Sequence, residues 1–151
     1  MTKIADLLNE IESKIIHADV SNEEVSKANI AWHLDHSLKV INSVIMALQK
    51  SDLNYKWSFN WKKSFLFLVK IIPRGKAKAP KGVRSYELIS ILDIQRQLKT
   101  ARSLAEELKT MDKNAYFLHP YVGQLHLKQA FIFLGIHTKH HLKIINDILK
   151  K

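Results

Sequence analysis

Apolar residues recur at three- and four-residue steps along most of this chain, whereas the apolar-polar alternation typical of strands is nearly absent. In a helix such spacing gathers the apolar side chains on one face, which then has to be buried. The segments that show this spacing are residues 4–15, 22–50, 61–72, 86–108 and 127–151. The sequence therefore predicts an all-α fold in which amphipathic helices form a bundle.

Local signals predict where these helices begin and end. Ser21, followed three residues later by Glu24, is a capping-box pattern that would open the second helix. Pro73 and Gly75 would end the third helix, and Ser85 would cap the fourth. The apolar residues that define the first four helices are Ile4, Leu7, Leu8, Ile11 and Ile15; Ile30, Leu34, Leu38, Ile41, Ile45 and Leu48; Trp61, Phe65, Leu68 and Ile72; and Leu88, Ile91, Leu92, Leu98, Ala105 and Leu108.

Length and composition fit one domain that spans residues 1–151. The longest apolar runs, 65–69 and 130–136, are far shorter than the roughly 20 residues that cross a bilayer, so neither a membrane span nor a membrane partner is expected. The first residues lack the pattern of a secretory signal, so the expected location is the cytoplasm. The sequence contains no cysteine, which excludes disulfides, thiolate nucleophiles and cysteine-ligated zinc. A bound metal would have to be held by nitrogen and oxygen.

Two histidines in the last predicted helix indicate a metal site. His137 and His141 are four residues apart, which places both imidazoles on one face of a helix. The apolar stripe through Phe131, Leu134 and Ile144 follows the same face, so the pair is expected to face inward. Ordinary core histidines are the alternative, although burying both rings requires polar partners for four nitrogens. The spacing alone leaves both interpretations open.

A third ligand would come from the second predicted helix, which carries His33 and His36. Periodicity slightly favours His33, because it projects nearer the Leu34 and Ile41 stripe, while His36 lies at the edge. An edge position suits a ligand as well, since substrate or water must reach an open coordination position. Three neutral histidines suit zinc, nickel and iron(II), so the ligands do not identify the metal. The sequence has no Glu-x-x-His pair, which argues against a carboxylate-bridged di-iron centre.

Three histidine motifs follow one another along the chain: Trp32-x-x-x-His36, His119-Pro120-Tyr121-Val122-Gly123 and His137-x-x-x-His141. With the loop at 72–77, they resemble the DinB-like superfamily of metal-binding bundles, most closely its uncharacterised DUF1569 family. The resemblance implies an up-down four-helix bundle core with an additional short helix. It also implies one divalent ion bound by His36, His137 and His141, because the histidine in that superfamily follows its tryptophan by four positions. Related proteins include thiol-dependent transferases and proteins with no known reaction.

The remaining polar residues near these motifs have several interpretations. His140 projects off the inward stripe and is expected beside the ligands or at the surface. His17 and His126 are expected at the surface. His119 precedes Pro120, which favours an extended backbone in the turn before the last helix. There it either caps the turn or reaches the metal mouth as an acid or base. His33, His119 and His140 are thus alternative ligands or neighbours of the ligands, and Asp35 is expected to be solvated.

The net charge of +10 is concentrated in one segment. Residues 53–86 contain nine lysine or arginine residues and no acidic residue, while the rest of the chain has fifteen basic and fourteen acidic residues. The centre of the segment is a loop marked by proline and glycine, which carries Arg74, Lys76, Lys78 and Lys81. This loop either attracts an anionic substrate or phosphate, or is a solvated loop that keeps the protein soluble.

Three classes of function are compatible with these features. The favoured class is a metal-dependent enzyme, either a hydrolase or a thiol S-transferase, that acts on a small-molecule substrate. If the basic loop attracts the substrate, the substrate is anionic. The second is a metal-stabilised binding module without turnover, and the weakest is nucleic-acid binding through residues 53–86. Trp57, Phe59 and Trp61 could stack on bases, but packing beneath the loop fits their spacing better. The sequence leaves the oligomeric state open, a homodimer included.

Overall fold

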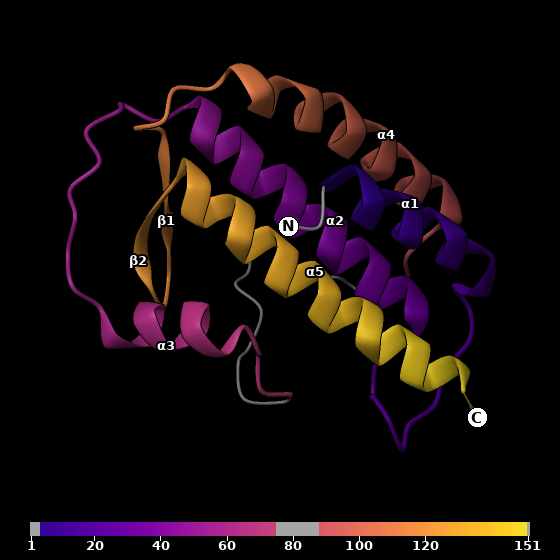
Figure 1. Ribbon diagram of the computed structural model, residues 1–151. Coiled ribbons are helices and arrows are strands. Elements are labelled where there is room, and N and C mark those ends of the chain that lie inside the picture. Colours follow the sequence, from indigo (N-terminus) through magenta and orange to yellow (C-terminus); the bar gives the residue numbers. More distant parts are fainter. Residues whose placement is uncertain (1–3, 75–87, 151) are drawn as a thin grey trace.

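The computed structural model describes residues 4–74 and 88–150. Helices α1, α2, α4 and α5 pack against one another, and α2 contacts both α4 and α5 (Figure 1). The helical fold class is thus confirmed for these residues, together with a small two-stranded sheet that was not predicted. The elements are α1 (Ile4–Lys14), η1 (Ile15–His17), α2 (Ile30–Gln49), α3 (Trp61–Val69), α4 (Ile91–Glu107), η3 (Leu108–Thr110), β1 (Tyr116–His119), β2 (Gly123–His126) and α5 (Leu127–Leu149).

Aliphatic side chains from the four packed helices form the core. Burying each one completely stabilises the fold by about 1.5–3 kcal/mol relative to exposure. The predicted apolar face of α2 is confirmed, because all six of its defining residues are at most 2% exposed. No helix in 4–74 or 88–150 is both long and apolar enough to cross a membrane. The central residues are Leu7, Leu8 and Ile11 of α1; Ile30, Leu34, Leu38, Ile41, Ile45 and Leu48 of α2; and Leu134, Ile144, Ile145 and Ile148 of α5.

Helix α2 begins later than predicted. Asn29 caps it, and the Asn29 side chain accepts a hydrogen bond from the Trp32 backbone N–H at 3.0 Å. The capping box expected at Ser21 is wrong, because the next residues form a turn in which the Ser26 N–H donates to the Asn22 carbonyl at 2.9 Å. A turn in place of the helix brings Ser26 back toward the first turn of α2.

Helix α4 also begins later than predicted, at Ile91. Ser90 caps it by accepting a hydrogen bond from the Asp93 N–H at 3.1 Å, while the predicted cap, Ser85, lies outside the described residues. The expected core positions in its first part are wrong, since Leu88 and Leu92 are 98% and 70% exposed. The residues of α4 that are buried are Ile94, Leu98, Ala101 and Leu104.

A β-hairpin leads directly into α5 (Figure 1). Strands β1 and β2 are antiparallel and pair His119 with Gly123, so the turn predicted before the last helix is the tip of this hairpin. Gly123 has φ +73°, a conformation that residues with a β-carbon rarely adopt. His126, expected at the surface, is partly buried and forms a capping box with Gln129 at the start of α5. The hairpin therefore fixes where α5 begins.

Helix α3 lies beside the hairpin, apart from the four packed helices (Figure 1). The buried Lys63 connects α3 to the hairpin, because its Nζ donates a hydrogen bond to the Gln124 carbonyl of β2 at 3.4 Å. Trp61, Phe65 and Leu68 are 65%, 56% and 81% exposed. The apolar spacing correctly predicts a helix here, but these apolar residues face solvent and not the core. The helix ends at Val69, earlier than the predicted end at Ile72, and its C-cap Lys70 has a left-handed backbone with φ 54°.

Candidate metal centre

Three histidines from two helices meet between α2 and α5. His36 of α2 and His137 and His141 of α5 each offer a ring nitrogen, and these three atoms lie within 4.8 Å of one another. The ring centroids of His137 and His141 are 4.7 Å apart, and His36 lies 5.1 and 4.9 Å from them respectively. His36 and His141 are buried, and His137 is partly buried. The three side chains are close enough together to bind a metal ion.

Helical geometry brings the rings together. One turn of α5 places His137 and His141 on the same face, as their spacing predicts. On α2, the Trp32 ring stacks on His36 with centroids 5.0 Å apart and an interplanar angle of 23°. Trp32 and His36 are also one turn apart, so the tryptophan limits the rotation of the imidazole. The Trp-x-x-x-His spacing therefore has a structural role in this protein.

One nitrogen of the cluster has no partner among the described residues. The Nδ1 atom of His137 is buried and makes no hydrogen bond there. Leaving a buried polar nitrogen unsatisfied costs on the order of 1–3 kcal/mol. Coordination of a cation would remove this cost, whereas a purely structural histidine would be expected to have a hydrogen-bond partner. The unsatisfied nitrogen therefore fits a ligand role.

Burial also sets the protonation state that coordination requires. Desolvation lowers the pKa of His137 well below its ordinary value, and the neighbouring His36 and His140 lower it further. Desolvation also lowers the pKa of His141, with added effects from His137, His36 and His33. A neutral imidazole keeps the lone pair that binds a metal. At neutral pH, His137 and His141 are therefore unprotonated and able to coordinate.

His33, which periodicity favoured, lies behind His141 rather than in the triad. Its Nδ1 is 3.0 Å from Nδ1 of His141, and its Nε2 is 3.0 Å from Oγ of Ser26. Both ring nitrogens are thus engaged, which leaves neither free for a metal. Burial lowers the pKa of His33 to about 4, with further effects from His36, His140 and Arg74. Sequence reasoning missed Ser26 because residues 22–29 were assigned to a helix.

His119 caps the hairpin turn, which was one of its two interpretations. Its Nδ1 accepts hydrogen bonds from the backbone N–H groups of Tyr121 at 3.1 Å and Val122 at 3.3 Å. The ring packs edge-on against Phe133, and burial lowers its pKa to about 4. Because Nδ1 is the acceptor, the neutral ring carries its proton on Nε2. His119 therefore presents an N–H donor rather than a base.

His140 and Arg74 lie close to the cluster. The partly buried His140 sets its ring edge-on to His141, with centroids 5.1 Å apart. The Arg74 guanidinium forms an ion pair with Asp147 of α5 at 2.6 Å and helps to lower the pKa of His140. The basic loop thus starts near the histidines. The other predicted anion-binding residues, Lys76, Lys78 and Lys81, lie outside the described residues.

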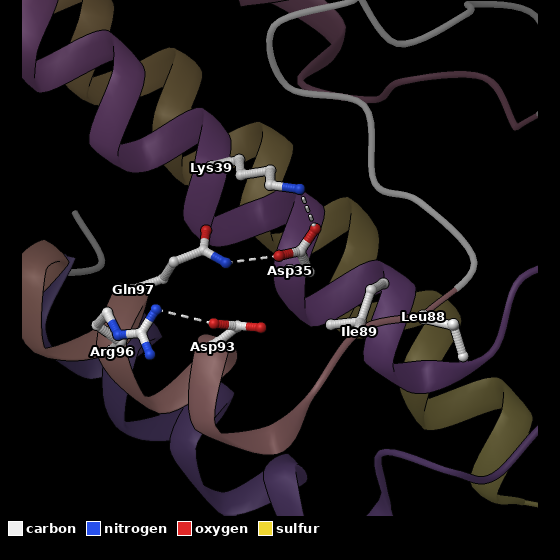
Figure 2. Close-up of a pocket in the computed structure, with 7 residues that line it drawn as sticks. All are labelled: Asp35, Lys39, Leu88, Ile89, Asp93, Arg96 and Gln97. Atoms are coloured by element: carbon white, nitrogen blue, oxygen red, sulfur yellow. Dashed lines mark hydrogen bonds and ion pairs between the residues drawn. The ribbon is translucent and has the colours of Figure 1, made fainter.

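Asp35 is buried, and the expectation that it would be solvated is wrong. Its Oδ1 accepts a hydrogen bond from Gln97 of α4 at 2.5 Å, and its Oδ2 pairs with Lys39 at 2.7 Å (Figure 2). These residues line a pocket of about 210 Å³ between α2 and the start of α4. One residue along a helix turns the side chain by roughly 100°. Asp35 therefore faces α4 while His36 faces α5, and this pocket is separate from the histidine cluster.

A scan against models of protein families, a search of curated proteins and a search of solved structures each found no match. The likeness to the DinB-like superfamily therefore rests on the three motifs and the loop described above. The function has to be argued from the histidine cluster.

Proposed function

We propose that this protein binds one divalent metal ion through His36, His137 and His141 and is a metal-dependent enzyme of the DinB-like type. The observation that carries the proposal is the convergence of three imidazole nitrogens within 4.8 Å from two separate helices. The buried, unsatisfied Nδ1 of His137 supports it independently. Zinc, nickel and iron(II) all suit such a donor set. The mutual packing of α1, α2, α4 and α5 is compatible with the bundle of that superfamily.

The arrangement favours catalysis over a closed structural site. When bound, the ion would lower the pKa of a coordinated water or thiol and supply a nucleophile near neutral pH. Three protein ligands leave at least one coordination position for water or substrate. His137 is only partly buried, so the cluster lies near the protein surface. A hydrolase or a thiol S-transferase acting on a small molecule fits these features, and a metal-stabilised binding module is the alternative.

Hydrogen bonds behind His141 indicate how the chain would orient this ligand. Nδ1 of His141 contacts His33, which leaves Nε2 as the nitrogen available for coordination. A coordinating Nε2 places the proton of the neutral ring on Nδ1, which then donates to Nδ1 of His33. His33 consequently carries its own proton on Nε2 and donates to Oγ of Ser26. This chain of hydrogen bonds would fix both the tautomer and the ring direction of the ligand.

The experiment that tests the proposal is elemental analysis of protein purified without a histidine tag. One equivalent of a divalent metal is expected. Cobalt(II) substitution then distinguishes an open metal site from a closed one, because visible absorption reports the coordination of cobalt. A spectrum that changes on addition of small thiols or anions indicates an open position. Protein that retains no metal and binds none on titration would contradict the proposal.

We predict that His36→Ala weakens metal binding far more than His33→Ala does. The first change removes a ligand, whereas the second removes a hydrogen-bond partner of a ligand, which typically costs 10–100-fold in affinity. His33→Asn should recover much of that loss, because the asparagine oxygen can accept the proton of His141 in place of Nδ1. Competition with a chromophoric zinc chelator measures all three affinities. The reverse order of the two alanine variants would show that His33 is the ligand.

Neutralising Arg74, Lys76, Lys78 and Lys81 together is expected to leave metal content and thermal stability nearly unchanged. The ion pair between Arg74 and Asp147 is partly exposed, and exposed pairs contribute only about 0–1 kcal/mol. If the loop attracts an anionic substrate, the substrate affinity falls and its salt dependence flattens. Affinities measured at two salt concentrations decide this. Values equal to those of the unmodified protein would identify the loop as merely solubilising.

A further inference from the structure

Helix α3 exposes an apolar face to solvent, while Leu66 and Phe67 on its other side are partly buried against the core. Its one buried residue is Lys63, which is 5% exposed. Trp61, Phe65 and Leu68 lie four and three residues apart and therefore share one face, and all three are more than half exposed. A surface helix normally buries its apolar face and exposes its lysines. The exposed apolar face of α3 is therefore a candidate surface for contact with a partner.

Exposed apolar residues also precede and follow the helix in the chain. Trp57 and Phe59 are each 74% exposed, and Ile71 is 63% exposed. Contiguous exposed patches larger than a few hundred Å² are uncommon on monomeric proteins and mark interaction sites. We name this surface the α3 patch and define it by Trp57, Phe59, Trp61, Phe65, Leu68 and Ile71.

Charge restricts the kind of partner that fits the α3 patch. The exposed residues Lys56, Lys62 and Lys70 lie among its apolar residues along the chain. Residues 53–86 contain no acidic residue. A second copy of the same surface would bring like charges together, which is unfavourable. The partner is therefore both apolar and anionic.

An anionic lipid surface meets this requirement better than a nucleic acid does. Leu68 and Ile71 have no aromatic ring on which a base could stack, yet Leu68 is the most exposed residue of the patch and Ile71 is more than half exposed. Tryptophan, phenylalanine and leucine beside lysine are typical of segments that lie in the membrane interface. We propose that the α3 patch docks this protein on an anionic lipid bilayer. The apolar side chains enter the boundary between headgroups and acyl chains, and the lysines contact lipid phosphates. This inference does not depend on the bound metal.

Co-sedimentation of the whole protein with lipid vesicles tests the proposal. Vesicles of phosphatidylcholine with about one third phosphatidylglycerol should bind the protein at least about tenfold more tightly than vesicles of phosphatidylcholine alone. Tryptophan emission should shift to shorter wavelength on binding, because Trp57 and Trp61 leave water. Replacing both with phenylalanine should remove most of the shift and retain binding. Failure of the folded protein to bind anionic vesicles would overturn the proposal.

Matched variants separate docking at the α3 patch from general stickiness. Phe65→Ser with Leu68→Ser should weaken vesicle binding at least about tenfold, because two inserted side chains are lost. The control is Leu88→Ser with Leu92→Ser, which removes two exposed leucines elsewhere and should change binding by less than about twofold. All four positions are exposed, so circular dichroism should show both proteins folded. Equal weakening by both pairs would overturn the assignment to α3.

Charge gives a third comparison. Lys62→Gln with Lys70→Gln should weaken binding to anionic vesicles by roughly 25-fold, at about fivefold per lysine, and leave the weak binding to neutral vesicles unchanged. Tighter binding to single-stranded DNA than to vesicles would overturn the proposal in favour of a nucleic-acid surface. A dimer that the Phe65→Ser, Leu68→Ser protein no longer forms would overturn it in favour of self-association.

Discussion

His137→Ala is expected to abolish stoichiometric metal binding while the helices remain folded. The change removes one of the three ligand nitrogens, and the core is stabilised mainly by aliphatic burial elsewhere. In the metal-free protein the change also removes the unsatisfied Nδ1 of His137. The stability gained in this way partly offsets the stability lost with the packing of the ring. Zinc at about one hundred times its dissociation constant should stabilise the unmodified protein by about 2.7 kcal/mol. That stabilisation should vanish in the variant.

The companion variant His141→Ala should lose the metal as completely and destabilise the metal-free protein more. It leaves the buried Nδ1 of His33 without its partner, at a cost of about 1–3 kcal/mol. His17→Ala is the matched control, because His17 is an exposed histidine distant in sequence from the cluster. Mass-spectrometric metal content and thermal unfolding with and without zinc provide the measurements. Full occupancy in both cluster variants would exclude metal binding at this site.

Acidification is expected to destabilise the metal-free protein steeply between about pH 6.5 and about pH 4. Burial lowers the pKa of His33 and of His119 to about 4, whereas in the unfolded chain both return to the ordinary range. Between these values the unfolded state binds more protons, so the free energy of unfolding falls as the pH falls. The stability is fully present above about pH 6.5, and the loss reaches roughly 1.4 kcal/mol per pH unit for each histidine. Protonation also releases metal, which adds to the loss in the metal-bound form.

Urea unfolding at several pH values in this range measures the effect. The net charge of the protein rises on acidification and destabilises it in the same direction. His119→Asn separates the two causes, because asparagine keeps an acceptor for the hairpin turn but does not titrate. In this variant the free energy of unfolding should change less steeply with pH than in the unmodified protein, by the contribution of one histidine. Equal slopes would show that His119 is not the source of the pH dependence.

The long helices were predictable because each buries one broad face. In α2 the residues from Ile30 to Leu48 follow the helical period closely, and their near-complete burial confirms the prediction. Helix starts were less predictable, since a serine followed by a glutamate three residues later also occurs in turns. The actual cap of α2 is Asn29, eight residues after Ser21.

Periodicity shows that an apolar face exists but not what covers it. The spacing of Trp61, Phe65 and Leu68 is helical, yet their face points to solvent. The hairpin strands have only four residues each, too few to show a strand pattern. Predicting either strand would have required knowing that it pairs with the other one.

The same limit applies to the histidine cluster. The spacing of His137 and His141 predicts their proximity, because both lie on one helix. His33 and His36 are 3% and 4% exposed, so burial does not distinguish them. The distinction depends on how α2 is rotated relative to α5, which is a tertiary property. Resemblance to a family supplied the choice of His36, where spacing alone slightly favoured His33.

The buried contact between Asp35 and Gln97 restricts the rotation of α2 about its own axis. Rotation of α2 would disturb the close packing of its aliphatic face, and the loss of the hydrogen bond from Gln97 to the buried carboxylate would add a further cost. Asp35 and His36 are neighbours in the chain, so any turn of α2 that moved His36 away from α5 would also break the contact with α4. Helix α4 contributes no histidine to the cluster, yet it sets the direction in which His36 points. Substitutions on α4 therefore offer a route by which the selectivity of this cluster can change during evolution while all three histidines are kept.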